Sequence, residues 1–160
     1  MIFVTVGTQL AFDRMVRVVD EWAGRTTPHP EVFAQIGPTS LAPKHIEHKA
    51  FVEPGEFAER ARAASAIVAH AGMGSIITAL TYGKPIVIMP RRAALGEQRN
   101  DHQLATAARF AGRAGVMVAR DETELPALLD RLATLRGAEP IPEFASEGLI
   151  RAIRDFIDRE

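Results

Sequence analysis

Two polar loops hold most of the residues in this chain that could do chemistry. The first is His-Ala-Gly-Met-Gly-Ser at positions 70–75, which follows an apolar run and opens a helix. Glycine lets the backbone approach a ligand closely, and a helix N-terminus presents unpaired N–H groups that favour a diphosphate. Ser75 adds a hydroxyl donor. A tight strand-to-helix turn with Ser75 as its cap explains this segment equally well when it is considered alone.

The second loop is Gly-Glu-Gln-Arg-Asn-Asp-His-Gln at positions 96–103, directly after a run that predicts a buried strand. Amide, carboxylate and imidazole groups suit a hydroxyl-rich ligand, because each donor and acceptor can be paired. The alternative is a solvated loop in which Asp101 caps the next helix. Arg91, Arg92 and Arg99 form a basic cluster beside this loop. That cluster either steers an anionic substrate or is solvated surface.

The composition excludes several other classes of site. The chain has no cysteine, which rules out disulfides, thiolate zinc sites and thiol nucleophiles. His29, His45 and His48 show no ligand spacing and are expected to be exposed, so no metal site is predicted. A net charge of -1 provides no field for holding nucleic acid or coating an anionic membrane. The glycines match neither a nicotinamide fingerprint nor a phosphate-binding loop with Gly-Lys-Ser/Thr.

Short apolar runs alternate with longer helical stretches and must position these loops. With 160 residues, of which 47% are hydrophobic and 24% charged, the chain fits one globular domain with a proper core. The alternation predicts an α/β fold whose parallel sheet is covered on both faces. We expect strands at 2–6, 32–36, 49–52, 66–69, 85–89 and 115–119. Helices are expected around 15–22 and at 54–64, 73–83, 101–111, 122–135 and 146–158, with a loop at 39–48 and a linker at 140–142.

The polar loops should meet at one edge of this sheet, because parallel sheets bind ligands beyond the carboxyl ends of their strands. Residues 7–9, 51–52, 70–75 and 90–103 all follow predicted strands, which predicts a single site. The opening at 1–6 is typical of a buried strand rather than a signal peptide, and no run of 18 apolar residues occurs. We therefore expect a cytoplasmic protein whose membrane attachment, if any, comes from a partner.

The segments at 70–92 and 96–107 resemble the C-terminal domain of family 28 glycosyltransferases, which include the MurG type. The opening Phe-Val-Thr-Val-Gly-Thr-Gln at 3–9, with Phe12 and Asp13, is similar to the small single-domain members. Those are exopolysaccharide and capsule subunits of the PssE type and the cytosolic subunit of the eukaryotic two-subunit N-acetylglucosaminyltransferase. The resemblance covers roughly residues 1–120. It implies a Rossmann-like donor domain at 1–140, equivalent to the C-terminal half of a GT-B transferase, followed by a linker and helix at 141–160.

The resemblance also implies a site for a UDP-sugar donor. The donor diphosphate would be bound by His70, Gly72, Met73, Gly74 and Ser75. The uracil and ribose would be held by Phe51, Val52 and Thr78, and the donor sugar by Glu97, Gln98, Asp101, His102 and Gln103. The side facing the acceptor would include Gly7, Thr8, Gln9, Arg91 and Arg92. Relatives often carry a ribose-binding glutamate at the position of Thr78, so either Thr78 makes a weaker contact or another residue, such as Glu97, takes that role.

The implied activity is an inverting, metal-independent hexosyl transfer that uses a UDP-sugar as substrate and needs no cofactor. No convincing general base is present, and the family places it on the acceptor half that this chain lacks. A membrane-anchored partner subunit and a lipid-diphosphate-linked saccharide acceptor are therefore expected, at the inner face of the membrane. The donor sugar stays open among glucuronate, galactose, glucose and N-acetylglucosamine. Arg91 and Arg92 could meet either an acidic donor sugar or the acceptor diphosphate.

The C-terminal helix carries an apolar stripe made of Leu149, Ile150, Ile153, Phe156 and Ile157. This stripe either covers the domain's own sheet or docks a partner. Three other functions remain open from the residues. The chain could be a non-catalytic UDP-sugar-binding regulatory module, an epimerase or hydrolase acting alone, or an interaction domain that binds no nucleotide. The polar loop at 96–103 argues against the last of these.

Overall fold

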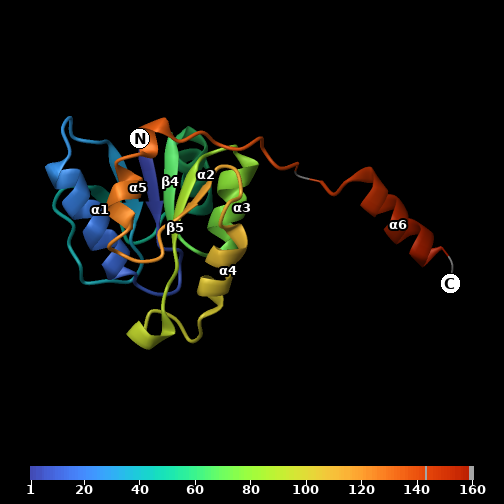
Figure 1. The fold of residues 1–160 in the computed structure, drawn as a ribbon, viewed down its shortest axis with the longest axis horizontal. Helices are drawn as coiled ribbons and strands as arrows, with labels where there is room; N and C mark the ends of the chain where they lie inside the picture. The colour runs from blue at the N-terminus through green and yellow to red at the C-terminus, as the bar shows by residue number, and fades with distance from the viewer. Residues whose placement is uncertain (143, 159–160) are drawn as a thin grey trace.

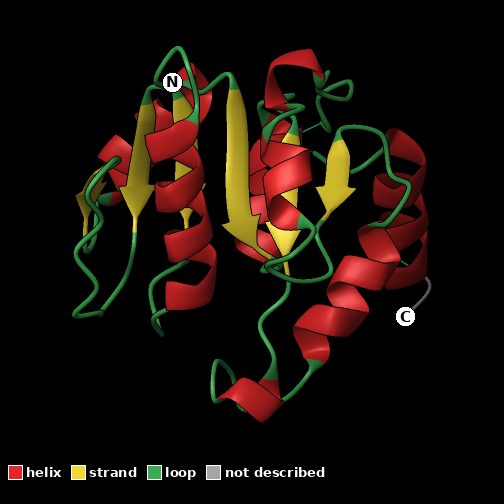
Figure 2. Ribbon diagram, turned by 60° about the vertical axis from the view of Figure 1, so that its left-hand side comes forward, coloured by secondary structure: helices red, strands yellow, loops and turns green. Residues whose placement is uncertain are grey.

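The computed structural model describes residues 1–142 and 144–158 and contains a six-stranded parallel sheet (Figures 1 and 2). The strands lie in the order β3-β2-β1-β4-β5-β6, and every neighbouring pair is parallel. Their bounds are β1 Ile2–Thr5, β2 Val32–Gln35, β3 Glu47–Lys49, β4 Ala66–His70, β5 Ile86–Met89 and β6 Val116–Val118. The predicted α/β class with one parallel sheet is confirmed. The order reverses between β1 and β4, which is the place where such sheets form a ligand crevice.

Helices cover both faces of the sheet, as its apolar strands require. Helices α1 (Asp13–Arg25) and α5 (Leu125–Leu129) pack on one face, and α2 (Pro54–Ala63), α3 (Met73–Thr81) and α4 (His102–Phe110) on the other (Figure 1). Side chains of β1 alternate between the two cores, because Val4 packs with Met15 of α1 whereas Phe3 packs with Ile76 of α3. Both cores lie against the central strands, so the loops that leave these strands start from rigid positions.

Helix α3 ends where the sequence predicts, at Gly83. The Gly83 N–H donates to the Leu80 carbonyl at 3.1 Å, and the Lys84 N–H donates to the Ala79 carbonyl at 2.8 Å. These two bonds form a Schellman motif, which needs a left-handed residue, and Gly83 has a φ of 62°. Pro85 then leads directly into β5. The motif fixes the direction in which α3 runs, and with it the position of the helix N-terminus at the other end.

Two predicted elements are wrong in their bounds. The strand expected at 49–52 lies instead at Glu47–Lys49. It is an edge strand with three exposed side chains, so no apolar run marks it, and the apolar pair Phe51-Val52 that suggested a strand follows it. The helix expected at 122–135 is broken into α5 and a short 3₁₀ turn, η2 (Leu132–Thr134). Asp121 accepts the Thr123 N–H at 2.9 Å, which holds a turn and delays the start of α5.

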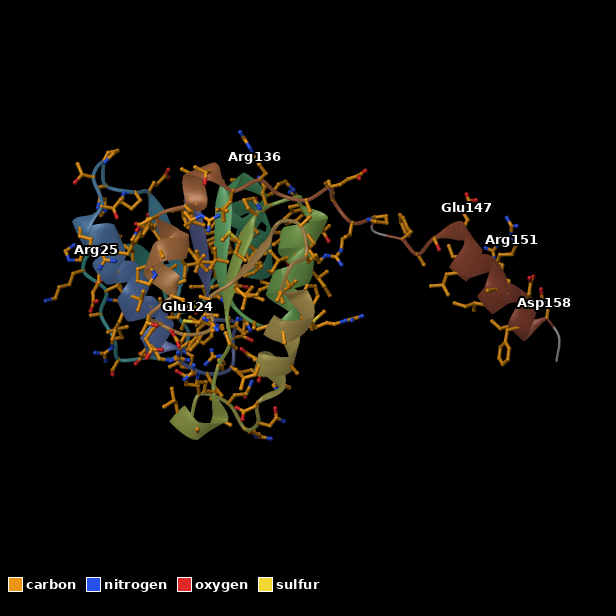
Figure 3. The ribbon with its side chains drawn as sticks, in the orientation of Figure 1. Arg25, Glu124, Arg136, Glu147, Arg151 and Asp158 are labelled. Carbon is orange, nitrogen blue, oxygen red and sulfur yellow. The ribbon has the colours of Figure 1, made fainter. Side chains whose placement is uncertain are left out.

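The last helix, α6 (Glu147–Ile157), lies apart from the rest of the domain (Figures 1 and 3). Its predicted extent is confirmed, and the Ser146 hydroxyl caps it by accepting the Leu149 N–H at 3.4 Å. None of its described residues is buried; Leu149, Ile153, Phe156 and Ile157 are exposed by between 51% and 72%, and Ile150 is partly buried. Of the two alternatives left open by the sequence, the structure does not show α6 covering its own sheet, whose faces are covered by other helices. Among the described residues, none of the helices combines the length and apolar character needed to cross a membrane.

Candidate functional site

A cleft of about 580 Å³ opens at the carboxyl edge of the sheet, next to the point where the strand order reverses. Loops that follow β1, β3, β4 and β5 all contribute to it, as the sequence predicts. Its described lining residues are Thr5, Val6, Gly7, Thr8, Gln9, Leu10, Gln35, Val52, Pro54, Phe57, His70, Gly72, Met73, Gly74, Ser75, Thr78, Arg91, Gln98, His102 and Gln103. A cleft of this size can hold a small organic ligand.

The N-terminus of α3 opens into this cleft. The first helical hydrogen bond at this end runs from the Ile76 N–H to the Gly72 carbonyl at 3.2 Å, so the amides of Met73, Gly74 and Ser75 precede the helical ladder. Among the described residues, no side chain caps this helix, although Ser75 was a candidate cap. Gly74 has open space where a Cβ would stand. The arrangement offers free donors and the positive end of a helix dipole to an anion.

His70 lies between two glycine loops at the floor of the cleft. A Cβ on Gly7 would stand 2.8 Å from its ring, and a Cβ on Gly72 only 2.2 Å from it, so both positions need glycine. The Nδ1 atom is buried and has no hydrogen-bond partner among the described residues. Burial lowers the pKa of His70 to about 4, and the positive charge of Arg91 acts in the same direction, against a smaller opposing effect from the Thr5 backbone. The ring is therefore neutral at physiological pH.

Gln35 is a cleft residue that the sequence analysis missed. Its side chain is 2% exposed, and its amide nitrogen donates to the Gly7 carbonyl at 3.1 Å and to the Thr5 hydroxyl at 3.3 Å. Its amide oxygen accepts the Val52 N–H at 3.1 Å. Gln35 thus joins the loop after β1 to the loop after β3. The signal that could have found it is one amide inside an otherwise apolar strand, at the strand's carboxyl end.

Arg91 is not part of an exposed basic cluster, and the prediction that it meets an anion is not supported by its position. Its side chain is 2% exposed although it reaches the cleft wall. The guanidinium donates to backbone carbonyls, among them those of Val6 at 2.7 Å and Leu10 at 2.6 Å. Arg92 does not line the cleft, and its side chain lies 3.6 Å from the Asp121 carboxylate.

Three of the predicted sugar-binding residues reach the cleft, namely Gln98, His102 and Gln103. Gln103 is 2% exposed, and its amide oxygen accepts the Arg91 N–H at 3.1 Å, which leaves its amide nitrogen as the group available to a ligand. His102 is exposed, and its Nδ1 contacts the Asn100 side chain. These three side chains present both donors and acceptors along one wall.

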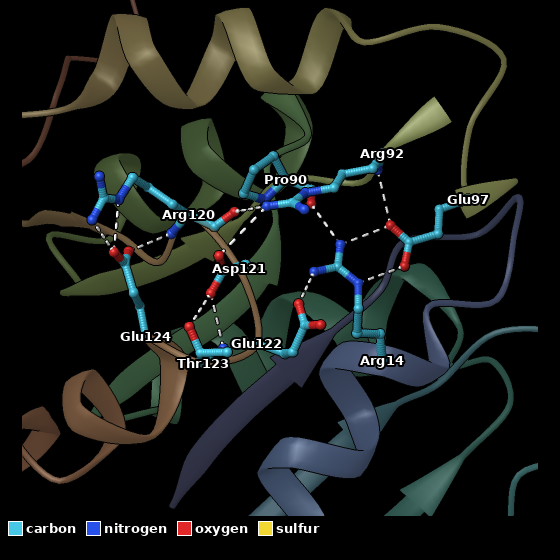
Figure 4. A network of polar contacts seen from close by, with 9 residues as sticks. All are labelled: Arg14, Pro90, Arg92, Glu97, Arg120, Asp121, Glu122, Thr123 and Glu124. Carbon is cyan, nitrogen blue, oxygen red and sulfur yellow. Dashed lines mark hydrogen bonds and ion pairs between the residues drawn. The ribbon is translucent and has the colours of Figure 1, made fainter. Parts of the chain in front are cut away.

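Two other residues of the same loop are turned to structural contacts, which corrects their predicted role. Glu97 makes a bidentate ion pair with Arg14, with both N–O distances at 2.8 Å, and its carboxylate also accepts the Arg92 N–H at 2.9 Å (Figure 4). The Glu97 hydrogen bond is the main cause that raises the pKa of Arg14. Asp101 accepts the Ala93 N–H at 2.8 Å. Neither side chain lines the cleft.

The Arg14 network ties the second polar loop to the body of the domain. Besides Glu97, Arg14 contacts the Glu122 carboxylate at 2.6 Å and the Pro90 carbonyl at 3.2 Å (Figure 4). It therefore joins α1 to the loops that follow β5 and β6. Because the Arg14 and Glu97 side chains are only 14% and 12% exposed, solvent screens this pair less than an ordinary surface ion pair.

The residues predicted to hold the uracil and ribose also divide into some that line the cleft and one that lies outside it. Val52 and Thr78 line the cleft, whereas Phe51 is 49% exposed and lies outside it. The Thr78 hydroxyl donates to the Gly74 carbonyl at 2.8 Å, so only its acceptor capacity is left for a ligand. Within the described part of the chain, no three histidine or carboxylate groups are gathered closely enough to hold a metal ion.

Comparisons with known proteins agree with this fold. The family model "Glycosyltransferase family 28 C-terminal domain" matches residues 1–143. The solution structure of ALG13 superposes with a TM-score of 0.62 at 19% identity and covers 94% of this chain and 93% of its own. MurG from Acinetobacter baumannii gives a TM-score of 0.59 at 22% identity, covering 82% of this chain and 40% of its own. The calicheamicin glycosyltransferase CalG4 gives 0.60 at 18% identity, covering 82% and 34%. No curated protein matched significantly.

The chain belongs to the glycosyltransferase family 28 C-terminal domain family. Its fold is the Rossmann-like half of the GT-B glycosyltransferases that it resembles, as the sequence predicts. The chain spans about a third of the length of several of those structures, 34% in the case of CalG4. It therefore matches only part of those longer chains, whereas it matches 93% of ALG13.

Proposed function

We propose that the chain binds a UDP-sugar donor and acts as the donor half of a glycosyltransferase. The observation that carries this proposal is the uncapped N-terminus of α3 in the cleft, where Gly72 and Gly74 leave the backbone amides open. Three unpaired amides and the helix dipole match the charge and the acceptor oxygens of a diphosphate. Family membership supports the same ligand, because the matched domain is a glycosyltransferase domain.

The walls of the cleft match the other parts of such a donor. Gln98, His102 and Gln103 provide polar groups for the hydroxyls of a sugar. Val52, Pro54 and Phe57 form an apolar wall on the side of α2, which suits a flat base. The Thr78 hydroxyl also lines the cleft and can accept one hydrogen bond from the ribose.

The proposed reaction is a direct displacement at the anomeric carbon of the sugar. The acceptor oxygen forms a bond to that carbon, the bond to the UDP oxygen breaks, and the configuration inverts. Negative charge grows on the leaving diphosphate, and the amides of Met73, Gly74 and Ser75 stabilise it. We propose that this electrostatic stabilisation makes a divalent metal unnecessary.

The reaction needs a base to take the proton of the acceptor hydroxyl. His70 is a poor candidate, because its ring is buried and its pKa is lowered to about 4. We therefore place the base on a membrane-anchored partner subunit that also binds a lipid-diphosphate-linked saccharide, as in exopolysaccharide or capsule assembly. The exposed apolar stripe of α6 is the proposed contact with this partner. The chain would then act at the inner face of the membrane through its partner.

Calorimetric titration of the purified chain with UDP, UDP-glucose and NAD tests donor binding. We expect saturable binding of UDP and UDP-glucose and none of NAD. Sugar transfer to a lipid-diphosphate acceptor is then measured with and without the co-expressed membrane-anchored candidate. Transfer only by the pair supports the subunit assignment, whereas UDP binding without any stimulated transfer supports a regulatory module. Absence of nucleotide binding would refute both.

A further inference from the structure

We propose that Arg91 is a positioning residue whose guanidinium holds the loop 6–11 in shape at the mouth of the cleft, while its backbone N–H binds Gln103. The contacts themselves do not depend on the ligand, but the consequence for catalysis rests on the proposed function. Arg91 comes from the loop after β5, and the loop that it holds follows β1, about 80 residues earlier in the chain.

The guanidinium is surrounded by carbonyl groups of this loop. Its two terminal nitrogens donate to the carbonyls of Val6 at 2.7 Å and Leu10 at 2.6 Å, to that of Ala11, and to that of Glu97 at 3.3 Å. A planar fork with five donors can serve several acceptors at once, which an ammonium group on a flexible stem cannot do in the same geometry. The loop carbonyls therefore converge on one side chain.

Two further contacts keep the guanidinium in place. It lies over the ring of Phe12, 4.7 Å from the ring centre, and Phe12 is fully buried. Glu97 is the carboxylate whose negative charge acts on the pKa of Arg91. That carboxylate forms its ion pair with Arg14, and no direct ion pair to Arg91 is found among the described residues. The burial of a cation without a paired carboxylate is costly, which indicates that the carbonyl contacts and not charge neutralisation hold Arg91.

The same residue also touches the opposite wall of the cleft. The Arg91 N–H donates at 3.1 Å to the amide oxygen of Gln103, a residue of α4 that lines the cleft. Thr8, Gln9 and Leu10 of the held loop line the cleft as well. Arg91 thus connects the wall proposed to read the donor sugar with the loop proposed to face the acceptor. The Arg91 side chain holds the loop and the Arg91 backbone holds Gln103, so a shift of either wall reaches the other through this one residue.

Amide hydrogen exchange of the free chain tests this inference. In Arg91→Met, which keeps the apolar stem and removes the donors, we expect the hydrogen-bonded amides of Val6 and Gly7 at the start of the loop to exchange about tenfold faster or more. Amides of the central strand β4 should keep their protection and so report an intact core. Arg92→Gln is the matched control, because it removes the same charge from a side chain that does not line the cleft. It should leave the loop unchanged.

Arg91→Lys separates the fork from the charge and serves if Arg91→Met does not fold. Lysine should loosen the loop almost as much as methionine, because one ammonium cannot meet the converging carbonyls. Loop exchange at the wild-type rate in either variant would overturn the inference. UDP titration of the same samples keeps the two proposals apart. A wild-type chain that binds no UDP, together with a loosened loop in the Arg91 variants, refutes the proposed function and supports the role of Arg91.

Discussion

A single added methyl group at Gly74 should weaken ligand binding without harming the fold. Gly74 is the second residue of α3, is exposed, and lines the cleft. A Cβ built there meets nothing within 4 Å, and the residue does not have a positive φ. Gly74→Ala is therefore compatible with the backbone. The methyl group would occupy space that a diphosphate needs in order to reach the amides.

The size of the effect follows from the contacts that are lost. A hydrogen bond to a charged group contributes about 1.5–3 kcal/mol, and the methyl group should displace the ligand from at least one amide. Since about 1.4 kcal/mol corresponds to a tenfold change in affinity, the Kd for UDP should rise roughly 10- to 100-fold. Alanine is a better helix former than glycine by up to about 1 kcal/mol, so Tm should stay level or rise by up to about 4 °C.

Gly55→Ala is the matched control for this variant. Gly55 is also the second residue of its helix, α2, is also exposed, and also has open space around its Cβ position, but it does not line the cleft. Both variants are compared with the wild type by UDP calorimetry and thermal unfolding. If Gly74→Ala binds UDP within about twofold of Gly55→Ala while both are folded, the proposal that the α3 amides grip a diphosphate is wrong.

Three further outcomes are expected. The pKa of His70 is about 4 when folded against 6.5 ordinarily, so the unfolded chain binds the proton first and stability is lost as pH falls from about 6.5 to about 4. Chemical unfolding at pH 7 and pH 4 should show that wild type loses about 3 kcal/mol more than His70→Asn, and equal losses would contradict the assigned burial. Glu97→Gln should cost about 1–2 kcal/mol of stability through the Arg14 pair yet keep UDP affinity; a large affinity loss at unchanged stability would restore Glu97 as a ligand. Deletion of residues 146–160 should leave Tm within about 2 °C but abolish co-purification with the partner, and a large drop in Tm would show that α6 belongs to the core.

The local pattern of the sequence was enough for most of the elements. Apolar runs located β1, β2, β4, β5 and β6, because helices cover both faces of the sheet and these strands are therefore mostly apolar. The hydrophobic pattern failed for β3, which is an edge strand with exposed side chains. It also failed for the segment after Arg120, where a turn held by Asp121 delays the start of the expected helix. In both places hydrogen bonds rather than burial determine the structure, and such bonds leave little trace in hydrophobicity.

The sequence predicted the backbone part of the candidate site, but it predicted less well which side chains face the cleft. The glycine-rich turn at 70–75 was recognisable because close backbone approach and an open helix N-terminus need particular residue types at particular positions. Gln35 was missed, although an amide inside an apolar strand was a usable signal. Glu97 and Arg91 were assigned to the ligand, but in the structure they serve Arg14 and the loop after β1. Polar side chains look alike in a sequence whether they face a ligand or the protein.

The amino-acid sequence by itself determined the α/β class, the family and the loop that opens the mid-chain helix, because periodicity and glycine placement are local properties of the chain. Only the tertiary structure decided which polar groups face the cleft, because their partners are distant in sequence. Arg91 meets carbonyls about 80 residues away, and Arg14 meets Glu97 and Glu122, which are 83 and 108 residues away in the chain. It also decided that α6 leaves its apolar stripe uncovered, since that depends on whether other helices have already covered the sheet.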